Sequence, residues 1–141
     1  MTEDKIVEVA AGLIFSKGRL LIAQRKKSDH LGGLWEFPGG KLEPDENYHD
    51  CLRRELTEEL GVETAVGPLL CAVEHAYSDK TVRIKFHQCR LITGKPQPLG
   101  CAALEWVSAA ELANYEFPPA DQQILNIIRD REDLWQADKD S

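Results

Sequence analysis

The segment 47–60, NYHDCLRRELTEEL, constrains the fold more than any other part of the chain. Its apolar residues Tyr48, Leu52, Leu56 and Leu60 recur at every fourth position, which is the spacing of one buried face of an α-helix. The glycine that follows is typical of a helix C-cap. A helix with such a stripe needs a core to pack against, and 141 residues with 43% hydrophobic content suffice for a single globular domain.

Three glutamates share one side of this predicted helix. With Leu56 at zero on a helical wheel, Glu59, Glu55 and Glu58 lie at about −60°, −100° and −160°. Glu55 and Glu59 form an i, i+4 pair of like charges, which destabilises a helix. Arg54 can pair with Glu58, but one cation for three carboxylates leaves a negative site suited to Mg²⁺, or to Mn²⁺ in its place.

An acidic helix face alone is usually only a solvated surface, so the spacing of the surrounding residues decides the interpretation. The chain reads G-x5-E-x7-R-E-L-x-E-E-x-G-V, beginning at Gly40 and ending at Val62. This pattern resembles the Nudix hydrolase signature at every specified position. The stretches EFPGGK (36–41) and FPPAD (117–121) also resemble the MutT branch of that family.

The resemblance implies both a fold and an activity. The implied fold is α/β (α+β), with a mixed β-sheet sandwiched between α-helices in a single Nudix domain over residues 1–141, of which 136–141 form a frayed tail. The implied activity is Mg²⁺-dependent hydrolysis of a nucleoside triphosphate to a nucleoside monophosphate and pyrophosphate. Such enzymes include 8-oxo-dGTP diphosphatases, which remove oxidised nucleotides and so serve DNA repair.

The resemblance also implies roles for the residues of the signature. Glu55, Glu58 and Glu59 would hold the metal, with the Gly40 carbonyl as a further ligand. Arg54 would be oriented by a carboxylate from the loop before the helix. The predicted catalytic residues are therefore Glu58, Glu59, Arg54 and Glu46, and one of the helix glutamates would take the proton from water.

Substrate contacts are predicted outside the helix. Arg25 matches the position of a family arginine, and the resemblance implies that it contacts the phosphates or the sugar; Asp79 matches a family loop that approaches the substrate. Lys41 lies beside the glycines, and aromatic rings suit a base. The predicted substrate-binding residues are Arg25, Phe37, Gly39, Lys41, Asp79 and Asp121, and Tyr77 is a second candidate for stacking.

The resemblance implies that Asp121 reads the base, because the MutT branch commonly places a base-reading asparagine at the start of the final helix. An ionised carboxylate only accepts hydrogen bonds, so Asp121 should favour the N1–H and 2-amino group of guanine or the 4-amino group of cytosine. The alternative is that Asp121 merely caps or charges the N-terminus of the helix that follows.

One position departs from the family pattern. Relatives often carry a further metal-binding or basic glutamate shortly before the strand that reads LEWVS here, but this chain has Gly100 at that place and no acid between Gly94 and Leu104. Either water completes the metal shell, or Glu105 or Glu74 substitutes. The identity of the general base stays open.

The remaining elements follow from periodicity and from turn residues. Residues 6–15 and 20–25 form a predicted hairpin, and 26–35 form a glycine-containing loop. Further predictions are a long hairpin over 69–78 and 81–92, a strand over 104–108, a short helix over 109–113 capped by Ser108, and a final helix from Pro119.

Charge and composition restrict the partners. The net charge of −7 argues against binding a nucleic acid polymer, which requires a basic face. The four cysteines lack C-x-x-C spacing, so reduced thiols are expected. No apolar leader or membrane-spanning segment is apparent, which predicts a cytoplasmic location. The assembly is left open between a monomer and a homodimer.

Three alternatives remain at this point. A CTP- or dCTP-type pyrophosphohydrolase keeps the chemistry and changes the base. A nucleotide-sugar pyrophosphohydrolase changes the leaving group. A non-catalytic nucleotide-binding Nudix module belongs to a different class of protein, although such modules usually lose glutamates that this chain retains.

Overall fold

A computed structural model describes residues 5–136 and arranges them around one seven-stranded mixed sheet. The strands are β1 (Lys5–Ser16), β2 (Arg19–Gln24), β3 (Trp35–Glu36), β4 (Gly39–Lys41), β5 (Glu63–Ala76), β6 (Lys80–Thr93) and β7 (Ala103–Val107). The helices are α1 (Tyr48–Leu60), α2 (Gln122–Arg129) and α3 (Glu132–Gln136), with 3₁₀ turns η1 (Leu112–Asn114) and η2 (Pro119–Asp121).

Strand β1 is the centre of the sheet. The main path runs β3-β2-β1-β6-β5, while β4 pairs with β1 and β7 pairs with β2. β1 is parallel to β6 and antiparallel to β2 and β4. The two predicted hairpins are confirmed as β1–β2 and β5–β6. The short strands β3 and β4 arise in a stretch that sequence reasoning treated as irregular.

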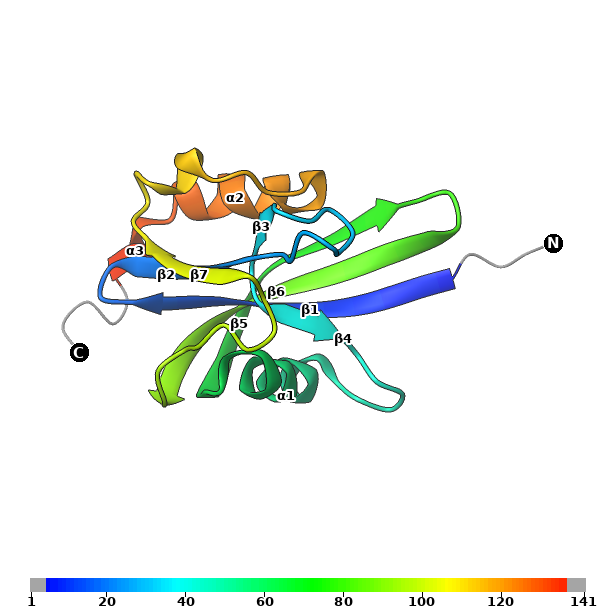
Figure 1. Ribbon diagram of the computed structural model, residues 1–141, viewed down its shortest axis with the longest axis horizontal. Helices are drawn as coiled ribbons and strands as arrows, with labels where there is room; N and C mark the ends of the chain where they lie inside the picture. Colours follow the sequence, from blue (N-terminus) through cyan, green and yellow to red (C-terminus); the bar gives the residue numbers. More distant parts are fainter. Residues whose placement is uncertain (1–4, 137–141) are drawn as a thin grey trace.

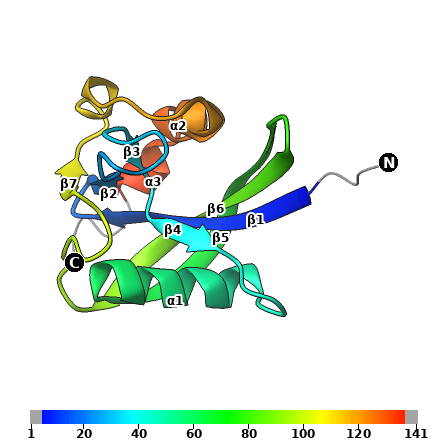
Figure 2. The ribbon, with the colours of Figure 1, turned by 45° about the vertical axis from the view of Figure 1, so that its right-hand side comes forward.

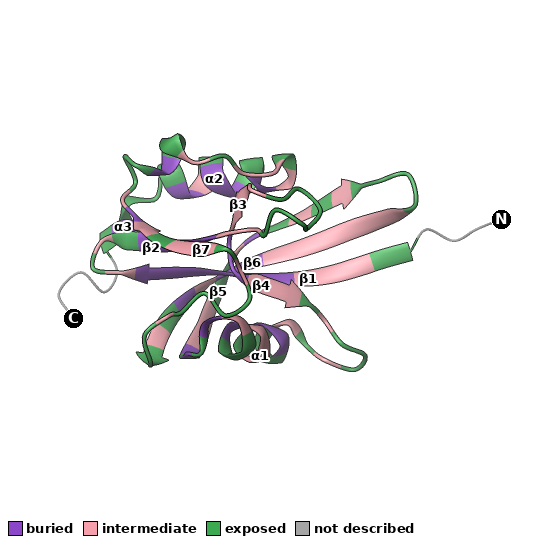
Figure 3. Ribbon diagram, in the orientation of Figure 1, coloured by how far each residue is buried: buried purple, intermediate pink, exposed green. Residues whose placement is uncertain are grey.

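Helices cover both faces of this sheet, as Figure 1 shows. α1 lies against one face, and α2 and α3 lie against the other, so the predicted sheet between helices is confirmed. The buried residues form a layer on each side of β1, visible in Figure 3. Leu52, Leu56 and Leu60 of α1 are fully buried, and they pack on the face that carries Ile14 and Leu21.

Both ends of α1 are fixed by local hydrogen bonds. The Asn47 side chain accepts from the Asp50 N–H at 2.8 Å and caps the first turn. Gly61 adopts a left-handed φ of 71° and donates its N–H to Thr57, which confirms the predicted C-cap. The helix register, and with it the side of the helix on which the glutamates lie, is therefore fixed.

The predicted helix boundaries after β7 need correction. Ser108 and Glu111 exchange two hydrogen bonds, at 2.9 and 3.2 Å, but only the 3₁₀ turn η1 follows instead of a helix over 109–113. The final helix begins at Gln122, because η2 occupies the three residues from Pro119. Gln136 belongs to α3, and the rest of the predicted frayed tail lies outside the described residues.

The four cysteines are free thiols, as predicted. Cys51, Cys71 and Cys89 are buried, and Cys101 is half-buried. Burial raises the pKa of Cys89 to about 12, which keeps this thiol protonated and unreactive at neutral pH.

Candidate active site

Arg54 connects the acidic residues around α1. It binds Glu46 through two hydrogen bonds, from Nε at 2.8 Å and from Nη2 at 2.9 Å. Its Nη1 donates to Glu55 at 2.9 Å and lies 3.4 Å from Glu58. The contact from Glu46 to Arg54 was predicted from the spacing and is present. Arg54 therefore fixes the positions of two helix carboxylates from one side.

Arg54 does not neutralise all of this charge. Hydrogen bonds from Arg54 lower the pKa of Glu46 to about 2, so this carboxylate stays ionised. Burial raises the pKa of Glu55, with the Arg54 hydrogen bond acting against that rise. Burial, followed by the charges of Glu55 and Glu36, raises the pKa of Glu59 to about 7. The excess negative charge is thus concentrated at Glu55 and Glu59.

The glycine strand β4 lies directly against these glutamates. A Cβ atom on Gly40 would be 2.3 Å from the Glu55 carboxyl carbon. The backbone N–H of Gly39 is near the Glu59 carboxyl and acts to lower its pKa. The Gly40 carbonyl, the predicted further metal ligand, accepts a weak hydrogen bond from the Cys51 thiol at 3.6 Å. This close approach brings backbone polar groups to the carboxylates, as the glycine pair predicted.

The donor set fits a hard divalent cation. Glu55, Glu58 and Glu59 offer oxygen ligands on one side of α1, beside a backbone carbonyl. Within residues 5–136, no three acidic, histidine or cysteine side chains are already arranged to hold a metal ion. Arg54 holds Glu55 and Glu58 in ion pairs instead. Glu55 binds Arg54 through one oxygen, whereas both oxygens of Glu58 lie 3.4 Å from Arg54 Nη1, so a bound cation would share Glu58 with Arg54.

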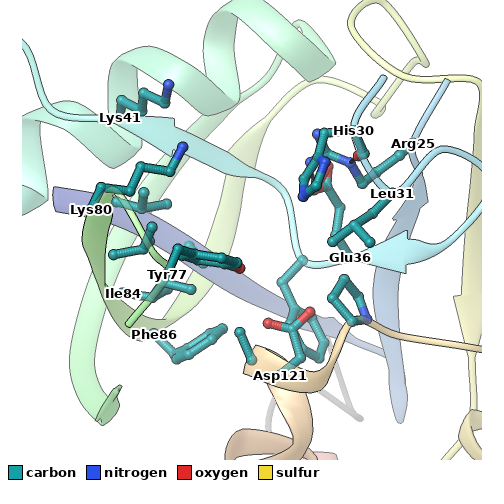
Figure 4. A pocket seen from close by; sticks show the side chains of 16 residues that line it. Arg25, His30, Leu31, Glu36, Lys41, Tyr77, Lys80, Ile84, Phe86 and Asp121 are labelled. Atoms are coloured by element: carbon teal, nitrogen blue, oxygen red, sulfur yellow. Dashed lines mark hydrogen bonds and ion pairs between the residues drawn. The ribbon is translucent and has the colours of Figure 1, made fainter. Parts of the chain in front are cut away.

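A pocket of about 340 Å³ opens next to the glycine strand. It lies between the β5–β6 hairpin and the loops before β3 and α2, as Figure 4 shows. Figure 2 shows these elements on the same side of the sheet. Lys41 and Lys80 line one end, and Asp121 lines the other (Figure 4). The full lining comprises Val9, Ala11, Arg25, His30, Leu31, Glu36, Phe37, Lys41, Tyr77, Lys80, Val82, Ile84, Phe86, Pro118, Ala120 and Asp121.

Arg25 reaches this pocket but is already engaged. Its Nη1 donates to Glu36 at 2.6 Å, and its Nε donates to the His30 carbonyl at 2.7 Å. These bonds tie the loop 25–34 to β3 and orient Glu36. A phosphate contact by Arg25 stays a prediction, and the contacts present show this side chain supporting Glu36.

Asp121 faces the same pocket from η2. Asp121 is only 8% exposed, and its carboxyl group makes no capping hydrogen bond to α2. Burial, and then the charge of Glu36, raise the pKa of Asp121 to about 7, while Arg25 acts in the opposite direction. The structure therefore contradicts capping by a hydrogen bond, but Asp121 does stand at the N-cap of α2, so the alternative that it only places a charge at the helix N-terminus stays open.

Phe37 is a core residue at the floor of the pocket. It is 5% exposed and stacks on Phe117 with ring centroids 5.2 Å apart. Phe86 contacts its edge at 6.0 Å. Since Phe117 already covers one ring face, any base contact of Phe37 would use the part that lines the pocket.

Of the residues predicted at the substrate from the β5–β6 turn, Tyr77 lines the pocket and Asp79 does not. Asp79 is exposed and is not among the pocket residues. Its neighbour Lys80 lines the pocket, as does Tyr77, which is 39% exposed. The turn is therefore close to the site, but the side chains that face the pocket are Lys80 and Tyr77 and not the acid Asp79.

Gly100 lies against Glu59. A Cβ atom on Gly100 would be 3.1 Å from the Glu59 Cγ atom, so an acid from this position would meet the helix carboxylates. Glu105 cannot substitute, because it pairs with Ile22 in the sheet and shares the face opposite α1. Glu74 is held by Arg83 at 2.7 Å, which leaves it committed to another ion pair.

Glu36 is the site residue that sequence reasoning missed. It lies in β3 within the apolar run LWEF, and it is half-buried between the two parts of the site. Its charge influences both Glu59 and Asp121. An acid inside an apolar run was the available signal, since such a residue needs a partner when it is buried.

Sequence and fold place the chain in a known family. Residues 10–126 match the model of the NUDIX domain, and the chain belongs to the Nudix family. It is 38% identical to a CTP pyrophosphohydrolase of Escherichia coli over 121 residues, covering 86% of this chain and 90% of the relative. It is 42% identical to an 8-oxo-dGTP diphosphatase of Proteus vulgaris over 87 residues, covering 61% of this chain and 78% of the relative.

Solved structures agree with this assignment. A MutT NUDIX hydrolase from Burkholderia pseudomallei superposes with a TM-score of 0.80 at 25% identity. The match covers 89% of this chain and 99% of that one. The MutT-like branch predicted from the flanking motifs is thus confirmed.

Proposed function

We propose that this chain hydrolyses a nucleoside triphosphate to a nucleoside monophosphate and pyrophosphate, with Mg²⁺ as the cofactor and Mn²⁺ as a substitute. The observation that carries the proposal is the junction of two sites at β4. The α1 carboxylates, with their excess negative charge, lie against β4. The pocket lies next to β4 and has cations at one end and acids at the other. The pocket dimensions suit a single base and sugar.

The bound cation would neutralise phosphate charge and activate water. The chain's own residues supply the rest. Arg54, held by Glu46, keeps Glu55 and Glu58 in place. Lys41 and Lys80 line one end of the pocket, where they would bind the phosphates. Glu59 would hold the cation together with Glu55 and Glu58, and one of the helix glutamates would take the proton from water.

A substrate panel tests this function. The purified protein is incubated with Mg²⁺ and dCTP, dGTP, 8-oxo-dGTP or UDP-glucose, and products are separated by chromatography. We expect a nucleoside monophosphate and pyrophosphate from at least one triphosphate, as the names of the two relatives indicate for those proteins. Binding of a triphosphate without turnover would instead identify a non-catalytic module. Turnover of UDP-glucose alone would favour the nucleotide-sugar alternative.

Metal binding should be visible without turnover. We expect about 10 mM Mg²⁺ to raise the Tm of the ligand-free protein by ~2–5 °C, because a cation relieves repulsion that exists only in the folded state. Differential scanning calorimetry measures the shift. Glu59→Gln should reduce it. An unchanged Tm in both Mg²⁺ and Mn²⁺ would contradict a metal site at α1.

Location and assembly belong to the same proposal. No helix within residues 5–136 combines the length and hydropathy needed to cross a membrane. A cytoplasmic location and a monomeric or homodimeric state stay predictions, as does a single domain over residues 1–141. Light scattering coupled to size exclusion measures the assembly directly.

A further inference from the structure

A pair of histidines lies outside the candidate active site, where α1 packs on the sheet. His49 is in the first turn of α1, and His87 is in the middle of β6. Their ring centroids are 4.9 Å apart, and the ring planes are inclined at 79°. On the helical wheel with Leu56 at zero, His49 lies at about +20°, in line with the buried leucines and away from the glutamates. The pair is therefore separate from the carboxylates of α1.

The hydrogen bond of His87 determines which of its ring nitrogens carries the proton. Its Nδ1 lies 3.1 Å from the Gly67 carbonyl oxygen, which only accepts hydrogen bonds, so Nδ1 is the donor. The lone pair of the neutral ring is then on Nε2. Within residues 5–136 this Nε2 atom has no hydrogen-bond partner, although His87 is only 5% exposed. Such a nitrogen is costly, because it has lost water and gained no replacement.

The same arrangement is typical of a histidine that binds a metal ion. A metal-bound imidazole is neutral, coordinates through one nitrogen and donates its other N–H to a backbone carbonyl or a carboxylate. Burial lowers the pKa of His87, the Gly67 hydrogen bond opposes this change, and the charges of His49 and Lys85 add to it. The neutral ring therefore presents Nε2 as a ligand.

The separation of the two rings suits a shared ion. Zn²⁺ binds imidazole nitrogens at about 2.0–2.1 Å in tetrahedral geometry, which places the centroids of two ligand rings about 5 Å apart. The observed 4.9 Å agrees with this value. His49 is exposed, so its ring can turn a nitrogen towards the ion without disturbing the core, and water can complete the shell.

The neighbouring side chains indicate the kind of ion. Cys51 and Cys89 belong to the same core layer, but burial raises the pKa of both thiols to about 12, so they are poor ligands at neutral pH. The Nζ atom of Lys85 lies over the Tyr48 ring, 4.3 Å from its centroid. The donors are therefore the two imidazoles, which suit Zn²⁺, Ni²⁺ or Cu²⁺, whereas Mg²⁺ prefers oxygen ligands.

We propose that His49 and His87 form a binding site for a transition metal ion of the Zn²⁺ class, separate from the Mg²⁺ site of the glutamates. The bound ion joins the first turn of α1 to β6. It thereby fixes the N-terminal end of the helix that carries Glu55, Glu58 and Glu59. The site involves no contact with substrate, so it stands or fails independently of the proposed function.

Calorimetric titration of the full chain with Zn²⁺ tests this site, with excess Mg²⁺ present throughout to occupy the carboxylates of α1. We expect His49→Gln to weaken Zn²⁺ binding at least ~10-fold, since it removes one of two protein ligands. His87→Gln should cause the same loss. Because His49 is exposed, the first variant remains informative even if the second does not fold, which circular dichroism establishes.

His75→Gln is the matched control. His75 also packs beside an aromatic ring, with its centroid 4.7 Å from that of Tyr77, but its neighbour is a phenol and not a second imidazole. Its Zn²⁺ affinity should stay within about 2-fold of the wild type, as for most changes away from a site.

NMR of the imidazole nitrogens locates the ion directly. On addition of Zn²⁺ we expect the resonances of His87 Nε2 and of one His49 nitrogen to shift, while those of His75 stay in place. Binding of Zn²⁺ only at the glutamates would leave the His49 and His87 resonances unchanged. That result, or a Zn²⁺ affinity that neither His49→Gln nor His87→Gln lowers, would overturn the histidine site.

Discussion

Glu59→Gln and Glu58→Gln are each expected to lower kcat by about 10²- to 10⁴-fold while the protein remains folded. Glutamine keeps the size of the side chain but removes the charge that a cation and a reacting water need. Glu58 is mostly exposed, and Glu59 is half-buried beside the sheet, so neither is a main component of the core. Steady-state kinetics with Mg²⁺ and the best triphosphate of the panel measure the effect, and calorimetry measures the stability.

The direction of the stability change is itself informative. Burial and neighbouring carboxylates raise the pKa of Glu59, so the ionised side chain is less stable in the folded protein than in the unfolded chain. Removing the ionisable group should therefore leave the Tm of the metal-free protein unchanged or higher at pH above 7. A loss of activity with a retained or raised Tm distinguishes a catalytic role from a structural one.

Glu105→Gln is the matched control for these two variants. Glu105 is an exposed glutamate of β7, on the face of the sheet opposite α1. It was a sequence-based candidate for the acid missing at Gly100, and the structure contradicts that assignment. We expect its kcat to stay within about 2-fold of the wild type, as for most surface changes. Near-normal turnover by Glu58→Gln and Glu59→Gln together would refute the assignment of the metal site to α1.

The parts of the site that were predictable are local in sequence. The helix register follows from Leu52, Leu56 and Leu60, so the common side of the glutamates could be derived from a 3.6-residue period alone. The Glu46–Arg54 pair lies across one loop and one helical turn, within reach of that register. Such features need no knowledge of how distant elements pack.

The parts that escaped prediction depend on packing between distant elements. Glu36 and Asp121 meet only because β3 and η2 line the same pocket, and no periodicity relates them. Contact of Arg25 with the phosphates or the sugar stays a prediction, but its contact with Glu36 was not predicted, since it arises from the pairing of β2 with β3. At the β5–β6 turn, sequence identified the turn but could not determine which side chain faces inward. Neighbouring residues of a strand point to opposite faces, so a shift of one residue places Lys80 at the pocket in place of the predicted Asp79.

The second large effect is expected at the two glycines of β4, with different outcomes for each. A Cβ atom on Gly39 would lie 1.9 Å from the Ala10 carbonyl oxygen, in the neighbouring strand β1. Backbone in the middle of a sheet cannot move aside, so Gly39→Ala should destabilise the fold by about 3 kcal/mol or more. Urea unfolding followed by circular dichroism measures this change.

Gly40→Ala should instead act on activity. The atom nearest to its added Cβ is the Glu55 carboxyl carbon at 2.3 Å, and a side chain can rotate away where backbone cannot. The fold should therefore survive, but Glu55 would leave the position that Arg54 gives it at 2.9 Å. Displacement of a catalytic group by about 1 Å can cost about 10²-fold, and we expect a loss of that order in kcat/KM.

A control and a double variant determine whether Gly40→Ala acts through Glu55. Gly33 has a φ of 87° and no atom within 4 Å of an added Cβ, so Gly33→Ala should cost only the ~1–2 kcal/mol of a left-handed alanine and leave kcat intact. If the Gly40 effect operates through Glu55, Gly40→Ala combined with Glu55→Gln should be no worse than Glu55→Gln alone, because the two changes remove the same interaction. Losses that multiply would show that Gly40 contributes separately, through its carbonyl or through the path of β4. An unchanged kcat/KM in Gly40→Ala would mean that the Glu55 carboxylate needs no fixed position, and its assignment as a metal ligand would then fail.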